Sequence, residues 1–78
     1  LEFRRVLFRS DGLTAYVEYR LRGDALDIIH TIVPKNLEGR GIAATLVETA
    51  YKYAKEQGLR PLATCSYAVV WLKRHPEF

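Results

Sequence analysis

The sequence has little of several residue types on which other classes of protein depend. It has one cysteine among 78 residues, which excludes an intramolecular disulfide. It has no run of the about 20 apolar residues that a transmembrane helix requires and no secretion-signal pattern, so we expect no membrane partner and a cytoplasmic location. Its five glycines and three prolines form no low-complexity linker. A chain of this length supports one small core, which predicts a single domain.

The first ten residues have a separate origin in our interpretation. Their sequence, LEFRRVLFRS, matches the translation of a widely used sequencing adapter, so we interpret residues 1–10 as an adapter-derived artefact and residues 11–78 as the domain. The full chain has 12 basic and nine acidic residues, a net charge of +3. Omitting the three arginines and one glutamate of this segment leaves nine basic and eight acidic residues. A charge so close to balance does not favour nucleic acid as a partner.

The hydrophobic pattern changes once along the chain, from the period of strands to the period of helices. Apolar residues alternate from Leu13 to Leu21, as on a half-buried strand. The next apolar run is rich in β-branched residues on both faces, which favours a central strand that is covered on both sides. From Gly41 apolar residues recur at helical spacing, and Gly58 ends this helix. A strand after it is expected to lie parallel to the central strand, because such crossovers join parallel neighbours.

These patterns together predict a mixed α/β fold of the α+β type. A second helix is expected after the last strand, with Ser66 as its N-cap. The predicted elements are antiparallel strands at 5–9, 13–22 and 25–33, a crossover helix at 41–57, a parallel strand at 60–64 and a terminal helix at 67–74.

The turn Gly39-Arg40-Gly41 joins the central strand to the long helix. Glycines let the backbone approach a ligand closely, and the N–H groups of a helix N-terminus attract anions. The turn therefore predicts a site for a ligand that carries a diphosphate, although a tight turn entering any helix also favours glycine.

Several separated motifs resemble one superfamily. Residues Glu38-Gly39-Arg40-Gly41-Ile42-Ala43 are similar to the signature of the GNAT-type N-acetyltransferases, in which Gln or Arg is followed by x-x-Gly-x-Gly or Ala; Glu38 departs from that pattern. Residues 11–78 resemble the short single-domain branch of this superfamily. The further matches are His30-Thr31, Cys65-Ser66-Tyr67 and the ending Arg74-His75-Pro76-Glu77-Phe78.

The resemblance implies that acetyl-CoA is the cosubstrate and that its acetyl group passes to an amine acceptor, either a small molecule or a protein. The diphosphate would lie on the glycine turn, and the pantetheine arm would pair with the backbone of the strand that ends near Val33. No metal is expected, because the histidines and the cysteine lack zinc spacing. The sequence does not decide whether the chain forms a homodimer. The implied cofactor-binding residues are Ile32, Val33, Glu38, Gly39, Arg40, Gly41, Ile42 and Ala43.

Acyl transfer from a thioester to an amine requires a neutral amine, a donor to the oxyanion and a proton for the leaving thiolate. Cys65 precedes the terminal helix, whose N-terminus favours a thiolate, so it is a candidate acyl-accepting nucleophile or proton relay, or else an inert core cysteine. Tyr67 is a candidate proton donor to the departing thiolate, or else a packing residue. His30, which alternation places on one face with Leu26 and Ile28, is a candidate base for the amine, or else a core residue, with water as the base.

A second function class fits the same sequence. Larger enzymes of the superfamily use additional helices and strands to shape the acceptor site, and most of these are missing from a chain of 78 residues. The alternative to an N-acetyltransferase is therefore a non-catalytic module that binds CoA or another protein.

Overall fold

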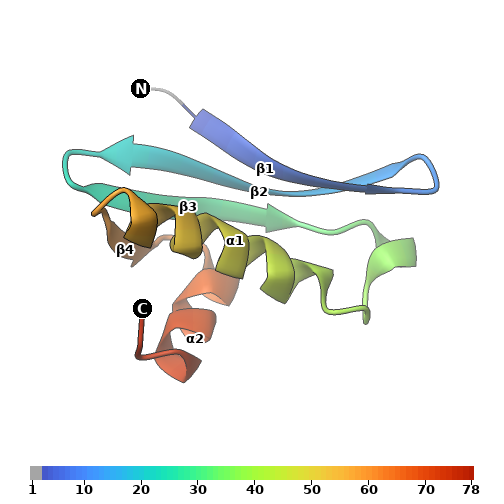
Figure 1. Ribbon diagram of the computed structural model, residues 1–78. Helices are drawn as coiled ribbons and strands as arrows, with labels where there is room; N and C mark the ends of the chain where they lie inside the picture. Colours follow the sequence, from blue (N-terminus) through green and yellow to red (C-terminus); the bar gives the residue numbers. More distant parts are fainter. Residues whose placement is uncertain (1–2) are drawn as a thin grey trace.

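The computed structural model describes residues 3–78, so two residues of the segment 1–10 lie outside the described part of the chain (Figure 1). The elements, in chain order, are β1 (Phe3–Ser10), β2 (Leu13–Arg22), β3 (Ala25–Ile32), the short 3₁₀ helix η1 (Lys35–Leu37), α1 (Ile42–Glu56), β4 (Arg60–Ala63) and α2 (Ser66–Arg74).

The strands form one mixed sheet in the order β1-β2-β3-β4. β1 pairs with β2 and β2 with β3 in antiparallel fashion, whereas β3 and β4 are parallel and α1 makes the crossover between them. This arrangement confirms the predicted mixed α+β fold. The predicted bounds differ from the observed bounds by at most two residues at each end.

The start of α2 differs from the prediction. Cys65, and not Ser66, is the N-cap residue, with an extended backbone at φ −65° and ψ 128°. The N–H groups of both Thr64 and Cys65 donate to the carbonyl oxygen of Ile28, at 2.9 and 3.0 Å. These bonds keep Cys65 extended beside β3 as the N-cap, so the helix begins at Ser66, one residue earlier than predicted, and its first bond runs from Val69 N–H to Cys65 O.

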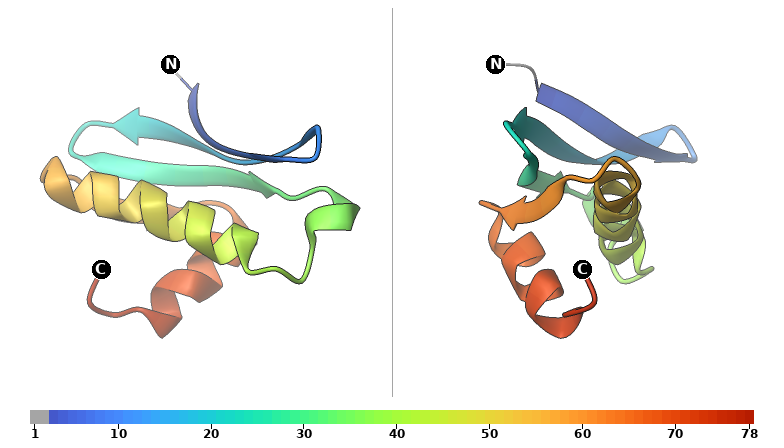
Figure 2. Two further views of the ribbon diagram at one scale, coloured as in Figure 1. Left: turned by 45° about the vertical axis from the view of Figure 1, so that its right-hand side comes forward. Right: turned by 60° about the vertical axis from the view of Figure 1, so that its left-hand side comes forward.

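Both helices lie on one side of the sheet (Figure 2). We call this side the helix face and the other side the open face, since no helix within residues 3–78 covers it. Side chains from the inner strands and both helices build a single core on the helix face. Its largest fully buried members include Val17, Leu26, Ile28, Leu37, Val47 and Tyr51.

β3 contains an irregularity that decides which of its side chains face the helices. Tyr19 pairs with Ile28, but the preceding residue of β2 pairs with His30, so Ile29 has no partner on β2. Such an extra residue is a β-bulge, and it inverts the alternation that follows. Because directly paired residues share a face, Thr31 lies on the helix face with Ile28, whereas His30 lies on the open face.

The structure corrects one expectation about β3. The strand is central, as predicted, but it is not covered on both sides. Ile32, beyond the bulge, is 44% exposed on the open face. Asp27 on the open face is only 2% exposed, yet its carboxylate contacts polar and charged side chains rather than a second apolar layer.

Candidate functional site

A cavity of about 400 Å³ lies where the end of β3 meets the N-termini of both helices. Its walls are mostly apolar side chains and backbone, with few polar groups, which is the usual composition of a small-molecule site. The lining residues are Thr31, Val33, Leu37, Glu38, Gly39, Gly41, Ile42, Ala43, Ala44 and Tyr67.

The glycine turn forms one wall of this cavity. Gly39 and Gly41 have φ values of +80° and +73°, a left-handed conformation that other residues rarely adopt. No atom outside the adjoining chain lies within 4 Å of the position that a Cβ at either glycine would take, so a ligand has room to approach the backbone. Gly41 is the N-cap of α1 and offers no side chain to cap the first-turn N–H groups. These N–H groups can therefore receive an anion.

The edge of β3 next to β4 is free beyond the point where the two strands separate. The last pair of the parallel ladder is Ile28 with Ala63, and β3 continues to Ile32. Within residues 3–78 no strand pairs with this edge after Ile28. A ligand arm with amide groups can bind there as an added strand would.

Cys65 stands beside this free edge. Its Sγ lies 3.5 Å from Oγ1 of Thr31, which also lines the cavity. Partial burial raises the pKa of the thiol, but hydrogen bonds from the Thr31 hydroxyl and from the backbone N–H groups of Ala68 and Tyr67 lower it, and the net pKa is below its ordinary value. The site therefore stabilises the thiolate more than water does around a free cysteine.

The structure brings together most of the predicted site residues. Val33, Glu38, Gly39, Gly41, Ile42, Ala43 and Tyr67 line the cavity. Tyr67 is 41% exposed in the first turn of α2. Cys65 is not a lining residue, and it reaches the cavity through its contact with Thr31.

Besides Cys65, three predicted residues do not line this cavity. The Arg40 side chain is exposed and adjoins a separate hollow beside Phe8 and Thr45. Ile32 pairs with Tyr16 on the open face, so only its backbone is near the free edge of β3.

His30 is the third of these residues, and the expectation for its face was wrong. The predicted alternation placed it with Leu26 and Ile28, but the bulge at Ile29 turns it to the open face, opposite Glu18. It is exposed there and is not a core residue. An alternating pattern read from a sequence contains no sign of a bulge.

Two residues of the site were missed by the sequence analysis. Thr31 belongs to the His30-Thr31 match, but no role was predicted for it. Asp27 was counted within an apolar strand, although it is a buried carboxylate that accepts hydrogen bonds from Thr64. Its partner lies 37 positions away in the sequence, and local periodicity carries no information on such a pair.

Within the described residues 3–78, we considered a metal centre and a membrane-spanning helix. No group of three or more His, Cys, Asp or Glu side chains is arranged to hold a metal ion. No helix in this part of the chain is long and apolar enough to cross a membrane.

The sequence matches a family model and several curated proteins. The model of the GCN5-related N-acetyl-transferase family matches residues 5–78. The chain is 39% identical to protein NATD1 of Bos taurus over 68 residues, which are 87% of this chain and 57% of that protein. It is 37% identical to protein NATD1 of Homo sapiens over 68 residues, with 87% and 57% of the two chains covered. The chain thus spans little more than half the length of these relatives. No solved structure matches the chain.

Proposed function

Because the chain belongs to the GCN5-related N-acetyltransferase family, we propose that it binds acetyl-CoA in the cavity beside the glycine turn and transfers the acetyl group to an amine. The observation that carries this proposal is that three features meet at one cavity or directly beside it. These are the uncapped N-terminus of α1, the free edge of β3 and the Cys65 thiol beside it.

The three features match the three parts of the substrate. The N–H groups that follow Gly41 suit the diphosphate, since a helix N-terminus and a glycine backbone favour anions. The unpaired backbone between Ile28 and Ile32 suits the two amides of the pantetheine arm. The thioester would then lie beside the Thr31 and Cys65 side chains, which contact each other.

The lowered pKa of the Cys65 thiol makes Cys65 a stronger candidate nucleophile than an ordinary cysteine. In this role the thiolate attacks the thioester carbonyl, the bond from that carbon to the sulfur of CoA breaks, and the leaving sulfur takes a proton. Tyr67 is the candidate donor of that proton. The amine then attacks the acetyl-cysteine, the carbon–Sγ bond breaks and an amide forms, with the amine proton passing to a base.

His30 is the candidate base, and its face suggests how the acceptor approaches. His30 and Thr31 point to opposite faces of β3, so an amine that contacts His30 on the open face would have to reach the thioester on the helix face past the end of the β3–β4 ladder. Water is the alternative base, as it is for an exposed site in general.

Calorimetric titration of the purified chain with acetyl-CoA and with CoA tests the binding step. We expect saturable binding of both, and Gly41→Glu is expected to weaken it at least about 10-fold, because a carboxylate there repels the diphosphate. Gly58→Glu is the matched control: Gly58 has φ +71° at the other end of α1, so the backbone strain and the added charge are alike. Absence of binding by the folded wild-type chain would overturn the proposal.

Turnover separates an enzyme from a module that only binds CoA. We expect slow release of CoA from acetyl-CoA, with a mass increase of one acetyl group on the wild-type chain that is lost in Cys65→Ala. A Tyr67→Phe chain should acetylate Cys65 more slowly. Binding without either reaction would leave the non-catalytic alternative.

A further inference from the structure

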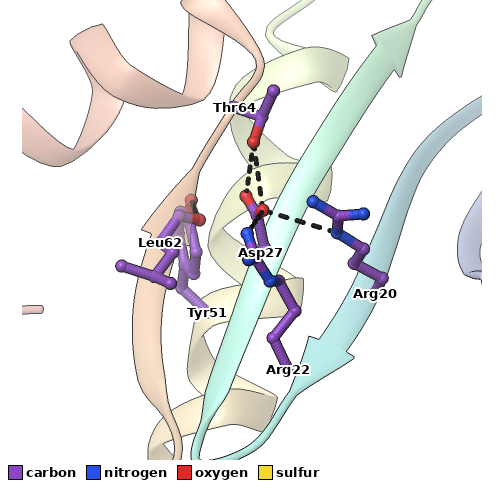
Figure 3. A network of polar contacts seen from close by, with 6 residues as sticks. All are labelled: Arg20, Arg22, Asp27, Tyr51, Leu62 and Thr64. Atoms are coloured by element: carbon purple, nitrogen blue, oxygen red, sulfur yellow. Dashed lines mark hydrogen bonds and ion pairs between the residues drawn. The ribbon is translucent and has the colours of Figure 1, made fainter. Parts of the chain in front are cut away.

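A polar network centred on one buried carboxylate lies on the open face and includes Thr64, the residue that precedes Cys65 (Figure 3). Its centre is Asp27, whose side chain is 3% exposed. Thr64 Oγ1 lies 3.1 and 3.0 Å from the two carboxylate oxygens, so the hydroxyl donates to the carboxylate. Arg20 and Arg22 are farther away, at 3.7 and 3.6 Å from the same oxygen.

The buried Asp27 carboxylate needs closer hydrogen-bond partners than a carboxylate in a surface ion pair. A buried carboxylate is costly unless it is both paired and hydrogen-bonded. The two guanidinium groups lie beyond ordinary hydrogen-bond distance, and Arg20 Nε is buried without a hydrogen-bond partner. Among the described side chains around Asp27, it is Thr64 that lies within ordinary hydrogen-bond distance of the carboxylate.

Thr64 is held from two directions at the point where β3 and β4 separate. Its N–H donates to Ile28 O at 2.9 Å, and its hydroxyl donates to Asp27 on the open face. Because successive side chains of an extended segment point to opposite faces, fixing Thr64 on the open face directs Cys65 to the helix face. There the thiol meets Thr31.

We propose that Asp27 is a positioning residue for Cys65: by holding the Thr64 hydroxyl on the open face, it fixes the end of β4 and aims the thiol at Thr31 and the cavity. The proposal deepens the proposed function, since it rests on a role of Cys65 in acetyl transfer. Its first consequence, the state of the thiol, is measurable without acetyl-CoA.

Thr64→Val is the variant of choice, because it removes the hydroxyl, keeps the shape and leaves the charge of Asp27 in place. Asp27→Asn is a poorer first test, since removal of a negative charge lowers a nearby thiol pKa and opposes the effect of lost positioning. The other ionisable group close to both is Tyr51 of α1, whose own pKa is raised by burial and by the charges of Asp27 and Cys65. Thr64→Val leaves Tyr51 unchanged.

The first measurement is the rate of Cys65 alkylation by iodoacetamide as a function of pH, on the full chain without ligand. We expect Thr64→Val to raise the midpoint of this profile by about 0.5–1 pH unit, because the thiolate moves away from its donors. Thr64→Ser retains a hydroxyl and should restore the wild-type midpoint. Thr49→Val, which removes an exposed hydroxyl from α1, is the control and should leave the profile unchanged.

The second measurement is the cleavage of acetyl-CoA by the same variants. Thr64→Val should lower kcat about 10-fold, as small misplacements of a reacting group do, and change the KM for acetyl-CoA less than about twofold. A Thr64→Val chain that folds and keeps the wild-type alkylation midpoint would refute the positioning role. If the wild-type chain binds no acetyl-CoA, the proposed function fails, and the alkylation profiles alone decide the inference.

Discussion

Tyr51 joins α1 to β4 through one hydroxyl group. Its side chain is almost fully buried, and its Oη donates to the carbonyl oxygen of Leu62 at 2.7 Å. Burial, helped by the negative charges of Asp27 and Cys65, raises the pKa of this phenol well above its ordinary value of 10. The folded protein therefore keeps Tyr51 protonated at a pH where the unfolded chain would ionise it.

Tyr51→Phe should lower the free energy of unfolding by about 1–2 kcal/mol at pH 7, since the Leu62 carbonyl loses its donor. The sign of the pH dependence follows from the raised pKa. The stabilisation by Tyr51 is complete below pH 10 and is lost as the pH rises toward the folded-state pKa, because only the unfolded state releases the proton. Urea unfolding at pH 7 and near pH 11 measures both effects.

The comparison at the higher pH is the sharper part of this test. The free energy of unfolding of the wild-type chain should fall more between the two pH values than that of Tyr51→Phe, which has no phenol at this position. The remaining tyrosines contribute equally to both chains. Equal losses in the two proteins would contradict the account of Tyr51.

At the scale of elements, α2 depends on a few contacts. Its two buried side chains are Ala68 and Trp71. The Trp71 ring lies 5.7 Å from the Tyr51 ring and stacks on His75 with a centroid distance of 3.9 Å. Because α2 carries Tyr67 and is preceded by Cys65, the packing of one tryptophan also holds one side of the site.

Trp71→Ala should lower the free energy of unfolding by about 3–5 kcal/mol, the usual cost of removing a buried large aromatic. Backbone amides of α2 should exchange with solvent faster than those of α1, because α2 opens first when its anchor is lost. Val70→Ala is the matched control. Val70 precedes Trp71 and is apolar, but it is 46% exposed, so its loss should change the free energy of unfolding by less than about 0.5 kcal/mol. A similar loss in both variants would mean that α2 does not depend on the Trp71 contact.

The elements themselves follow from periodicity, and the geometry of the site follows from it only in part. The four strands and the two α-helices are predicted to within two residues, because burial of one face imposes regular periods, whereas the short helix η1 was not predicted. The glycine turn is predicted because positive φ values select glycine. Thr31 lies on the helix face in place of His30 because one residue, Ile29, has no partner on β2. Isoleucine is common in regular strands, so its presence does not reveal the bulge.

Long-range polar contacts are the other part that the sequence leaves open. Asp27 reads as an interruption of an apolar strand, and Thr64 as the last residue of another strand. Their contact arises only when the parallel pairing of β3 and β4 aligns Asp27 with Leu62, two residues before Thr64. The register of a parallel pair is set by the whole crossover, including the length of α1, and not by either strand alone.

At the scale of the whole molecule, the outer strand β1 contributes little to the core. It pairs with β2 along its full length, yet most of its side chains are exposed, including Phe3 at 50% and Leu7 at 49%. Val6 packs against the core, and the Arg5 pair with Glu18 is a surface ion pair. The edge of an existing sheet presents unpaired backbone groups with which a foreign segment can also pair. The family model includes residues 5–10, so the foreign origin of residues 1–10 stays a prediction.

Removal of residues 1–10 tests that interpretation directly. Deletion should lower the free energy of unfolding by roughly 1–2 kcal/mol, about the contribution of one partly buried valine, because the other core residues come from the remaining elements. It should leave the dissociation constant for acetyl-CoA within about twofold of the full chain, since no residue of β1 lines the cavity. Denaturation and calorimetric titration of residues 11–78 measure the two quantities. A folded chain of residues 11–78 that binds acetyl-CoA 10-fold more weakly would show that β1 supports the site, and the segment would then have to be regarded as part of the domain.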